Sequence, residues 1–128
     1  MRIVGIGTDL IEVARIAASI ERHSDRFLRR ICTDAEIAYC SKMKMPAPFY
    51  AARFAAKEAV SKALGTGIGS ACGWRDIEVF RKPSGEPYII LRDAGAETAN
   101  QLGITRVMIT LTHTENYAAA NAIAIAES

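Results

Sequence analysis

A carboxylate, an ammonium group and a glycine turn follow one another in the middle of the chain. Glu58 and Lys62 are four residues apart, which places them on one face of a helix. The segment Gly65-Thr66-Gly67-Ile68-Gly69 comes next, and its backbone N–H groups can approach a ligand closely because three of the five residues have no Cβ. These groups suit a metal ion and a phosphorylated ligand. Taken alone, an ordinary exposed ion pair followed by a helix cap is the simpler interpretation.

A second carboxylate, which could act together with Glu58 and Lys62, lies near the N-terminus. Residues 2–7 are β-branched and rich in glycine, and they predict a strand. Because side chains alternate along a strand, Asp9 shares a face with Gly5 and Gly7, where another backbone can come near. Asp9 could therefore project into a cleft at the end of the strand. The alternative is that Asp9 caps the following helix, since aspartate is favoured at that position.

Helices are predicted on both sides of the central segment. One long central helix has Pro48 in its first turn and ends at Gly65. The apolar periodicity over 12–31 predicts a helix with Ser24 as a candidate break. Thr33-Asp34-Ala35-Glu36 is a capping box that begins a short helix, and a further helix over 93–102 stops at Gly103.

Strands account for most of the remaining chain. Residues 74–80 and 87–91 predict a β-hairpin, and 105–113 and 117–126 predict a second strand pair. Alanine occupies every second position from 118 to 126, which suits either a tight core or a symmetric subunit contact. The order of elements predicts a single α+β domain over 1–128 with a mainly antiparallel sheet.

Arginines gather on the predicted helix over 12–31. Arg15, Arg22, Arg26 and Arg29 are spaced by seven, four and three residues, so that they can form one stripe. Arginine favours bidentate recognition of carboxylates or phosphates. An acidic protein partner is favoured over nucleic acid, because the aromatic residues that stack on bases are sparse here. A merely solvated face is the open alternative.

Size and composition narrow the class of protein. With 128 residues the chain is small for an enzyme that encloses a large substrate by itself, and a net charge of +2 does not indicate bulk nucleic-acid binding. No apolar run approaches the roughly 20 residues of a membrane span, and no secretory leader is recognised, so a cytosolic protein is expected. Cys32, Cys40 and Cys72 show no paired spacing, which predicts reduced, partly buried thiols.

Three separated motifs together are more specific than any one of them. They are Gly5-Ile6-Gly7-Thr8-Asp9, the segment 54–67 that begins Phe54-Ala55-Ala56-Lys57-Glu58, and Leu111-Thr112-His113-Thr114. In this order and at this length the chain resembles the holo-[acyl-carrier-protein] synthase family, the short bacterial-type 4′-phosphopantetheinyl transferases. Thr110 and Thr112 stand where serine is often expected, a change that keeps the hydroxyl group.

The resemblance implies an activity and a catalytic set. Such enzymes transfer the phosphopantetheine group of coenzyme A to a serine of apo acyl carrier protein, release adenosine 3′,5′-bisphosphate and require Mg²⁺. It implies Asp9 and Glu58 as metal ligands, which agrees with the preference of Mg²⁺ for a few carboxylates. Lys62 would stabilise the leaving phosphate, and Glu58 or a water would take the proton from the serine.

The resemblance also implies coenzyme contacts, partners and an assembly. The expected coenzyme-binding residues are Lys44, Arg53, Lys62, Gly65, Thr66, Gly67 and His113. A homotrimer with its sites at subunit interfaces is implied, and acidic acyl carrier protein becomes the expected partner of the arginines. Two other classes stay open: a non-catalytic coenzyme A or nucleotide-binding module, and an interaction protein that works through the arginine-rich helix. The retained Asp9, Glu58 and Lys62 count against the former.

Overall fold

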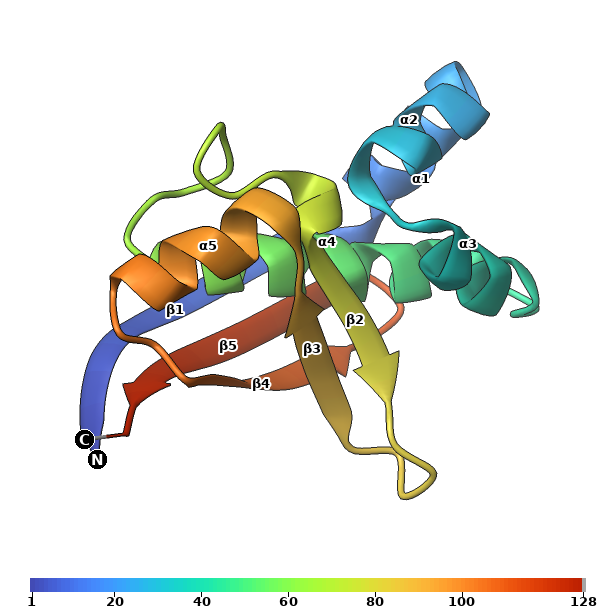
Figure 1. Cartoon of the computed structure of the whole chain (residues 1–128). Helices are drawn as coiled ribbons and strands as arrows, with labels where there is room; N and C mark the ends of the chain where they lie inside the picture. Colours follow the sequence, from blue (N-terminus) through green and yellow to red (C-terminus); the bar gives the residue numbers. More distant parts are fainter. Residues whose placement is uncertain (128) are drawn as a thin grey trace.

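The computed structural model describes residues 1–127 and has a long helix packed on one face of a three-stranded antiparallel sheet (Figure 1). The sheet has the order β1-β5-β4, and a separate antiparallel hairpin is formed by β2 and β3. The strands are β1 (Arg2–Glu12), β2 (Ile77–Arg81), β3 (Pro87–Leu91), β4 (Arg106–His113) and β5 (Tyr117–Ala126). The α+β class and the antiparallel pairing predicted from the sequence are confirmed.

The helices fall where the periodicity predicts them, with one interruption. They are α1 (Val13–His23), α2 (Asp25–Ile31), α3 (Asp34–Ser41), the central α4 (Pro46–Ala63) and α5 (Asp93–Gln101). The chain reverses at Ser24, whose φ of 49° is unusual for a residue with a side chain, so that α1 and α2 lie against each other. Figure 1 shows this pair, here called the arm, projecting away from the sheet.

Two local predictions were wrong. The first strand continues past residue 7 to Glu12, and Glu12 rather than Asp9 occupies the N-cap position of α1. Asp9 is therefore a strand residue and not a helix cap. Residues Trp74–Asp76, predicted as the start of a strand, form a short 3-10 helix, η1, before β2 begins.

Glycine allows β1 and α4 to lie in unusually close contact. A Cβ atom built at Gly5 would overlap the carbonyl oxygen of Ala63, and one built at Gly7 would overlap that of Ala59. The prediction that another backbone approaches these glycines is confirmed, and that backbone is the C-terminal half of α4. Asp9, two residues further on, is thereby brought to the same helix.

The alanine face of β5 is part of the core. Ala118, Ala120, Ala122 and Ala124 are buried, and α4 packs on β5 with alanines of its own. The tight-core interpretation is confirmed, and this face is not free to make a subunit contact. The opposite face of the sheet carries exposed apolar side chains from all three strands: Ile6, Leu10, Met108, Tyr117 and Ile123.

The three cysteines are free and fully buried, rather than partly buried as predicted. Burial raises the pKa of Cys32 to about 12 and the pKa values of Cys40 and Cys72 to about 11.

Of the helices in residues 1–127, none combines the length and apolar character that crossing a bilayer requires.

Candidate active site

Asp9 and Lys62 meet where β1 passes beneath the C-terminal half of α4. The Nζ atom of Lys62 lies 3.5 Å from Oδ1 of Asp9 and donates a hydrogen bond of 2.9 Å to the carbonyl oxygen of Thr8. In this half of α4, the accessible positions are Phe54, Glu58 and Lys62, spaced four residues apart. The predicted shared face is confirmed, and Asp9 lies beside it.

The carboxyl group of Glu58 is electrostatically linked to that of Asp9. Partial burial raises the pKa of Glu58, and the negative charge of Asp9 raises it further, while Lys62 opposes both effects. Asp9 and Glu58 are therefore close enough to repel each other. Two carboxylates that share one ammonium group leave an excess of negative charge, which a divalent cation would relieve.

The two carboxylates of Asp9 and Glu58 suit Mg²⁺ better than they suit a metal ion that takes all its ligands from the protein. Within residues 1–127, no group of three or more His, Cys, Asp or Glu side chains converges on one point. Mg²⁺ is usually held by one or two carboxylates, with waters and substrate phosphates as its other ligands. Asp9 and Glu58 meet that requirement.

The glycine turn after α4 closes the helix, which confirms the expected helix end at Gly65. Gly65 and Gly67 have φ values of 81° and 66°, as is typical of a helix end. The N–H of Gly65 donates to the carbonyl of Lys62, and those of Thr66 and Gly67 both donate to the carbonyl of Ser61. The prediction that these N–H groups are free for a ligand was wrong, because they cap the helix. The turn still adjoins Lys62, so coenzyme contact through its other atoms stays a prediction.

Lys44 and His113 lie at the other end of α4. The ring of His113 packs edge-on against that of Phe49, with ring centroids 4.9 Å apart, and Lys44 is exposed just before the helix begins. The 18 residues of α4 correspond to about 27 Å of helix. Within one chain, these two residues are therefore remote from the turn at Gly65 and are not brought together with it.

Arg53 is buried and does not reach the surface of the chain. It is 1% exposed, its guanidinium lies 4.4 Å from the centre of the Tyr39 ring, and it donates to the carbonyl oxygen of Phe49 at 3.4 Å. Its Nε is the one buried side-chain nitrogen or oxygen in residues 1–127 that has no hydrogen-bond partner. The predicted direct contact of Arg53 with the coenzyme has no support in this arrangement.

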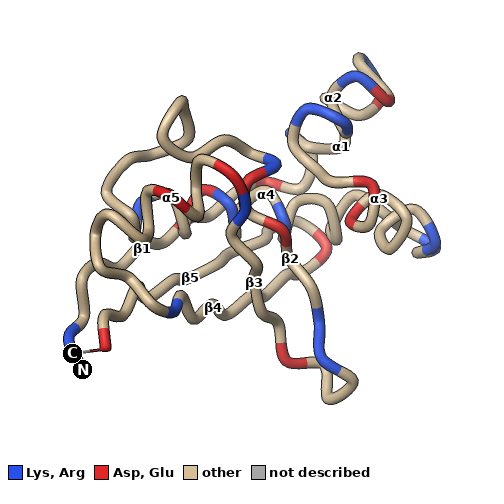
Figure 2. Tube along the Cα trace, in the orientation of Figure 1, with Lys and Arg blue, Asp and Glu red and all other residues tan. Residues whose placement is uncertain are grey.

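The arginines of the arm are exposed but do not form one stripe. Arg15 and Arg22 are on α1, whereas Arg26 and Arg29 are on α2, beyond the reversal at Ser24. The predicted stripe depended on a continuous helix, and the break removes it. Figure 2 nevertheless shows basic residues on both helices of the arm.

The two arginines of α2 have different surroundings. Arg26 lines a groove with His23, Phe27 and Arg30, and its Nη2 lies 3.2 Å from Nδ1 of His23. Arg29 lines another groove, whose wall includes acidic residues. The groove around Arg26 is therefore the more basic of the two.

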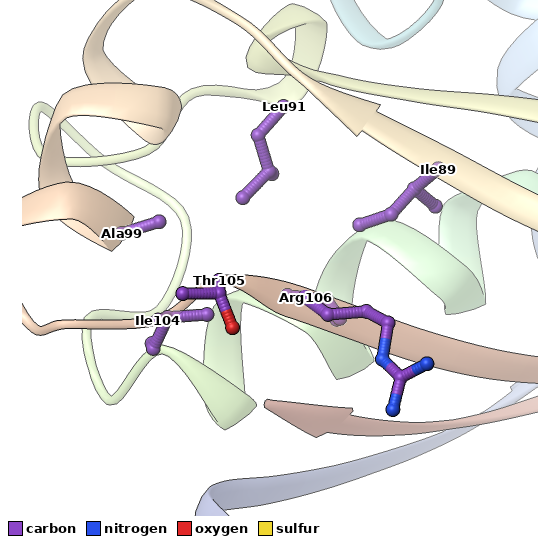
Figure 3. Close-up of a pocket in the computed structure, with 7 residues that line it drawn as sticks. Ile89, Leu91, Ala99, Ile104, Thr105 and Arg106 are labelled. Atoms are coloured by element: carbon purple, nitrogen blue, oxygen red, sulfur yellow. The ribbon is translucent and has the colours of Figure 1, made fainter. Parts of the chain in front are cut away.

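A further groove lies between β3, α5 and β4 (Figure 3). It has a volume of about 230 Å³ and is lined mainly by apolar residues, among them Ile89, Leu91 and Val107. Figure 3 shows Ile89 and Leu91 extending from β3 toward β4. None of the predicted site residues lines this groove, so we assign the chemistry to the junction of β1 and α4 instead.

Comparison with known proteins agrees with this geometry. The family described as the 4′-phosphopantetheinyl transferase superfamily matches residues 5–122, a stretch that contains Asp9, Glu58 and His113. A holo-[acyl-carrier-protein] synthase of Chlamydia pneumoniae is 48% identical over 126 residues, covering 98% of this chain and 100% of the relative. The chain belongs to the holo-[acyl-carrier-protein] synthase family. The resemblance seen in the three motifs is thus confirmed.

Solved structures of this family have the same fold. The synthase of Neisseria meningitidis superposes with a TM-score of 0.91 at 33% identity, covering 97% of this chain and 99% of that one. The synthase of Helicobacter pylori, solved in complex with coenzyme A, gives a TM-score of 0.84 at 31% identity and covers 94% and 99%. The arrangement of β1 and α4 that joins Asp9 to Lys62 therefore lies within a fold of this family.

Lys57 and Glu36 are functional candidates that the sequence did not reveal. Both side chains are fully buried, and their charged ends lie 2.6 Å apart. Glu36 was predicted to belong to a capping box, which is confirmed, but its pairing with Lys57 spans 21 residues of sequence and leaves no periodic signal.

Proposed function

We propose that this chain transfers 4′-phosphopantetheine from coenzyme A to a serine of apo acyl carrier protein and releases adenosine 3′,5′-bisphosphate. Family membership supports the reaction, and the Helicobacter pylori relative bound to coenzyme A supports the donor. The observation that carries the proposal is the convergence of Asp9, Glu58 and Lys62 at the junction of β1 and α4.

The proposed roles follow from charge and position. Asp9 and Glu58 would hold Mg²⁺, which would neutralise charge on the pyrophosphate of coenzyme A. Glu58, or a water beside it, accepts the proton of the carrier serine. Lys62 is half-exposed and can interact with the phosphate of the leaving group.

Separation along α4 supports a site shared between chains. Lys44 and His113 would contact the phosphates or adenosine of a coenzyme held by Asp9, Glu58 and Lys62 of a neighbouring copy. We propose a homotrimer in which the uncovered apolar face of the sheet is buried. A cytoplasmic location, expected from the sequence, belongs to the same proposal.

The arm is the proposed docking surface for the carrier protein. Arg15, Arg22, Arg26 and Arg29 are all exposed on it, and an acidic partner would be steered and oriented by their charge. Because the stripe is interrupted at Ser24, the carrier would contact α1 and α2 as two separate groups of arginines.

A mass-shift assay tests the reaction. Apo acyl carrier protein is incubated with coenzyme A, Mg²⁺ and the purified protein, and we expect the mass of the carrier to rise by one phosphopantetheine group. Asp9→Asn should give no increment while retaining the fold. Binding of coenzyme A by the wild type with no increment under any divalent metal would identify a binding module instead of a transferase.

A further inference from the structure

Lys57 precedes Glu58 on α4 but extends into the interior. Its ammonium group is fully buried and donates to Oε1 of Glu36 at 2.6 Å, the carbonyl of Ile31 at 2.6 Å and the carbonyl of Trp74 at 3.0 Å. An ammonium group has three donors, and each has an acceptor here. Lys57 is therefore held in one position from three directions.

Glu36 is held equally well. Its Oε1 accepts the N–H of Thr33 at 2.8 Å as well as the ammonium of Lys57, and its Oε2 accepts the N–H of Val79 at 2.9 Å. A buried ion pair is tolerated only when such bonds compensate for lost hydration. The pair thereby fastens the start of α3 and strand β2 to the middle of α4.

The bond to Ile31 gives this pair a place in the function. Ile31 is the last residue of α2, so Lys57 binds a carbonyl at the C-terminal end of the arm, where a positive charge is favourable. The other end of the arm is fixed where the N–H of Val13 donates to the carbonyl of Asn116 at 2.8 Å. Glu58 and Lys57 are neighbours on α4, but Glu58 faces the candidate active site whereas Lys57 binds the C-terminal end of the arm at Ile31.

We propose that the Lys57–Glu36 pair is a positioning device that fixes the arm relative to Glu58. A carrier protein docked on Arg22 and Arg26 then presents its serine at the correct distance from the site. This inference rests on the proposed function, and it assigns to Lys57 no contact with substrate. A small displacement of bound reactants is costly, since a misplacement of about 1 Å can reduce a rate by about a hundredfold.

Three variants separate positioning from stability. Lys57→Met leaves the carboxylate of Glu36 buried without its cation, and it should lower the melting temperature strongly. Adding Glu36→Gln removes that charge and keeps one acceptor oxygen for the N–H of Thr33 or of Val79, so the double variant should recover part of the lost stability. Ile104→Ala, a cavity-forming change in the loop between α5 and β4, is the control for lost stability alone.

The decisive readouts are kinetic and structural. In the double variant we expect kcat/KM for the carrier protein to fall by about tenfold or more, with KM for coenzyme A unchanged. Amide hydrogen exchange should accelerate in 25–32, because the end of α2 has lost its tie, and should stay slow in β5. Ile104→Ala should leave both the carrier kinetics and exchange in α2 unchanged.

Each result either supports or overturns the proposal. Carrier kinetics that recover together with the melting temperature, or unchanged exchange in α2, would show that the pair is structural only. A fall in kcat/KM for the carrier in Ile104→Ala equal to that in the double variant would lead to the same conclusion. Failure of the proposed function looks different: wild-type protein would then modify no carrier, whereas the exchange experiment would still report on the arm.

Discussion

Lys62 bridges Asp9 and the backbone of the strand that carries it, with its ammonium 3.5 Å from the Asp9 carboxylate and 2.9 Å from the carbonyl oxygen of Thr8. The same ammonium lowers the pKa of Glu58, against the effects of burial and of Asp9. Lys62 is thus the positive charge that moderates repulsion between two carboxylates. The proton affinity of this site depends on all three residues.

Removal of this charge should change the pH dependence of the reaction. Lys62→Met deletes the one group that lowers the pKa of Glu58, so that pKa should rise further and the acidic limb of the kcat/KM profile should move to higher pH. Raising the Mg²⁺ concentration should move the limb back, since a cation favours the ionised carboxylate. The pH profile of kcat/KM, recorded at two Mg²⁺ concentrations, measures the shift caused by the substitution and the shift caused by Mg²⁺. If the acidic limb of Lys62→Met lies at the wild-type pH, Lys62 does not act on Glu58 as proposed.

Glu58 should reduce stability in the metal-free protein. Its folded pKa is raised, so folding is penalised as pH rises above the unfolded value, and the penalty is complete above the folded pKa. At neutral pH, Glu58→Gln should therefore raise the melting temperature without Mg²⁺, an advantage that should disappear in acid. The same variant should lose activity by about a hundredfold or more, because even outer-shell partners of metal ligands contribute about 10- to 100-fold.

Mg²⁺ provides the matched comparison for this variant. A ligand at 100 times its Kd stabilises a protein by about 2.7 kcal/mol, so Mg²⁺ should raise the melting temperature of wild type. The melting temperature of the Glu58→Gln variant should change little when Mg²⁺ is added. An equal response of the two proteins to Mg²⁺ would place the metal away from Glu58.

Gly7 should be intolerant of even the smallest side chain. Gly7→Ala would place a methyl group against the carbonyl of Ala59, and over-packing of this kind costs about 1–3 kcal/mol. Because the displaced elements are β1 and α4, Mg²⁺ affinity should fall together with stability. Gly69→Ala is the control, since a Cβ there meets no atom within 4 Å. Calorimetric Mg²⁺ titration of the two variants compares them, and equal affinities would show that this contact does not position Asp9.

The apolar face of the sheet should be buried in the assembled protein. Ile6, Ile123 and Met108 are paired in register across β1, β5 and β4, and all three are exposed in the single chain. Ile123→Asp should shift the mass measured by light scattering from that of a trimer to the 13.9 kDa of one chain. Leu102→Asp, at an exposed apolar position outside the sheet, should leave the assembly intact. A wild-type protein that is already monomeric would refute the proposed trimer.

Much of the fold could be read from the sequence because local signals and tertiary packing agree. The 3.6-residue periodicity of α4 placed Phe54, Glu58 and Lys62 on one accessible face, and the alternation in β1 placed Asp9 with Gly5 and Gly7. The Thr33 capping box has the expected reciprocal bonds. In each case, a short stretch of chain determines the geometry.

Other predictions failed, some for local reasons and some because of partners distant in sequence. The N–H groups of Gly65, Thr66 and Gly67 donate to carbonyls of the helix end. Arg53 is buried beside Tyr39, and its contact with the coenzyme stays a prediction. The arginine stripe failed because a single residue, Ser24, reverses the chain. Lys57 was given no role beyond its place in the central motif, since nothing near it in sequence identifies its acceptors.

The length of α4 between Lys44 and the turn at Gly65 has a consequence for enzymology. If a single catalytic centre needs residues from both ends of this helix, it must draw them from different molecules, and an isolated polypeptide is inert. Specific activity should then decline on dilution, below the concentration at which subunits dissociate, and should recover after reconcentration. Mixing two inactive mutants, one altered at each end, should restore part of the turnover by complementation.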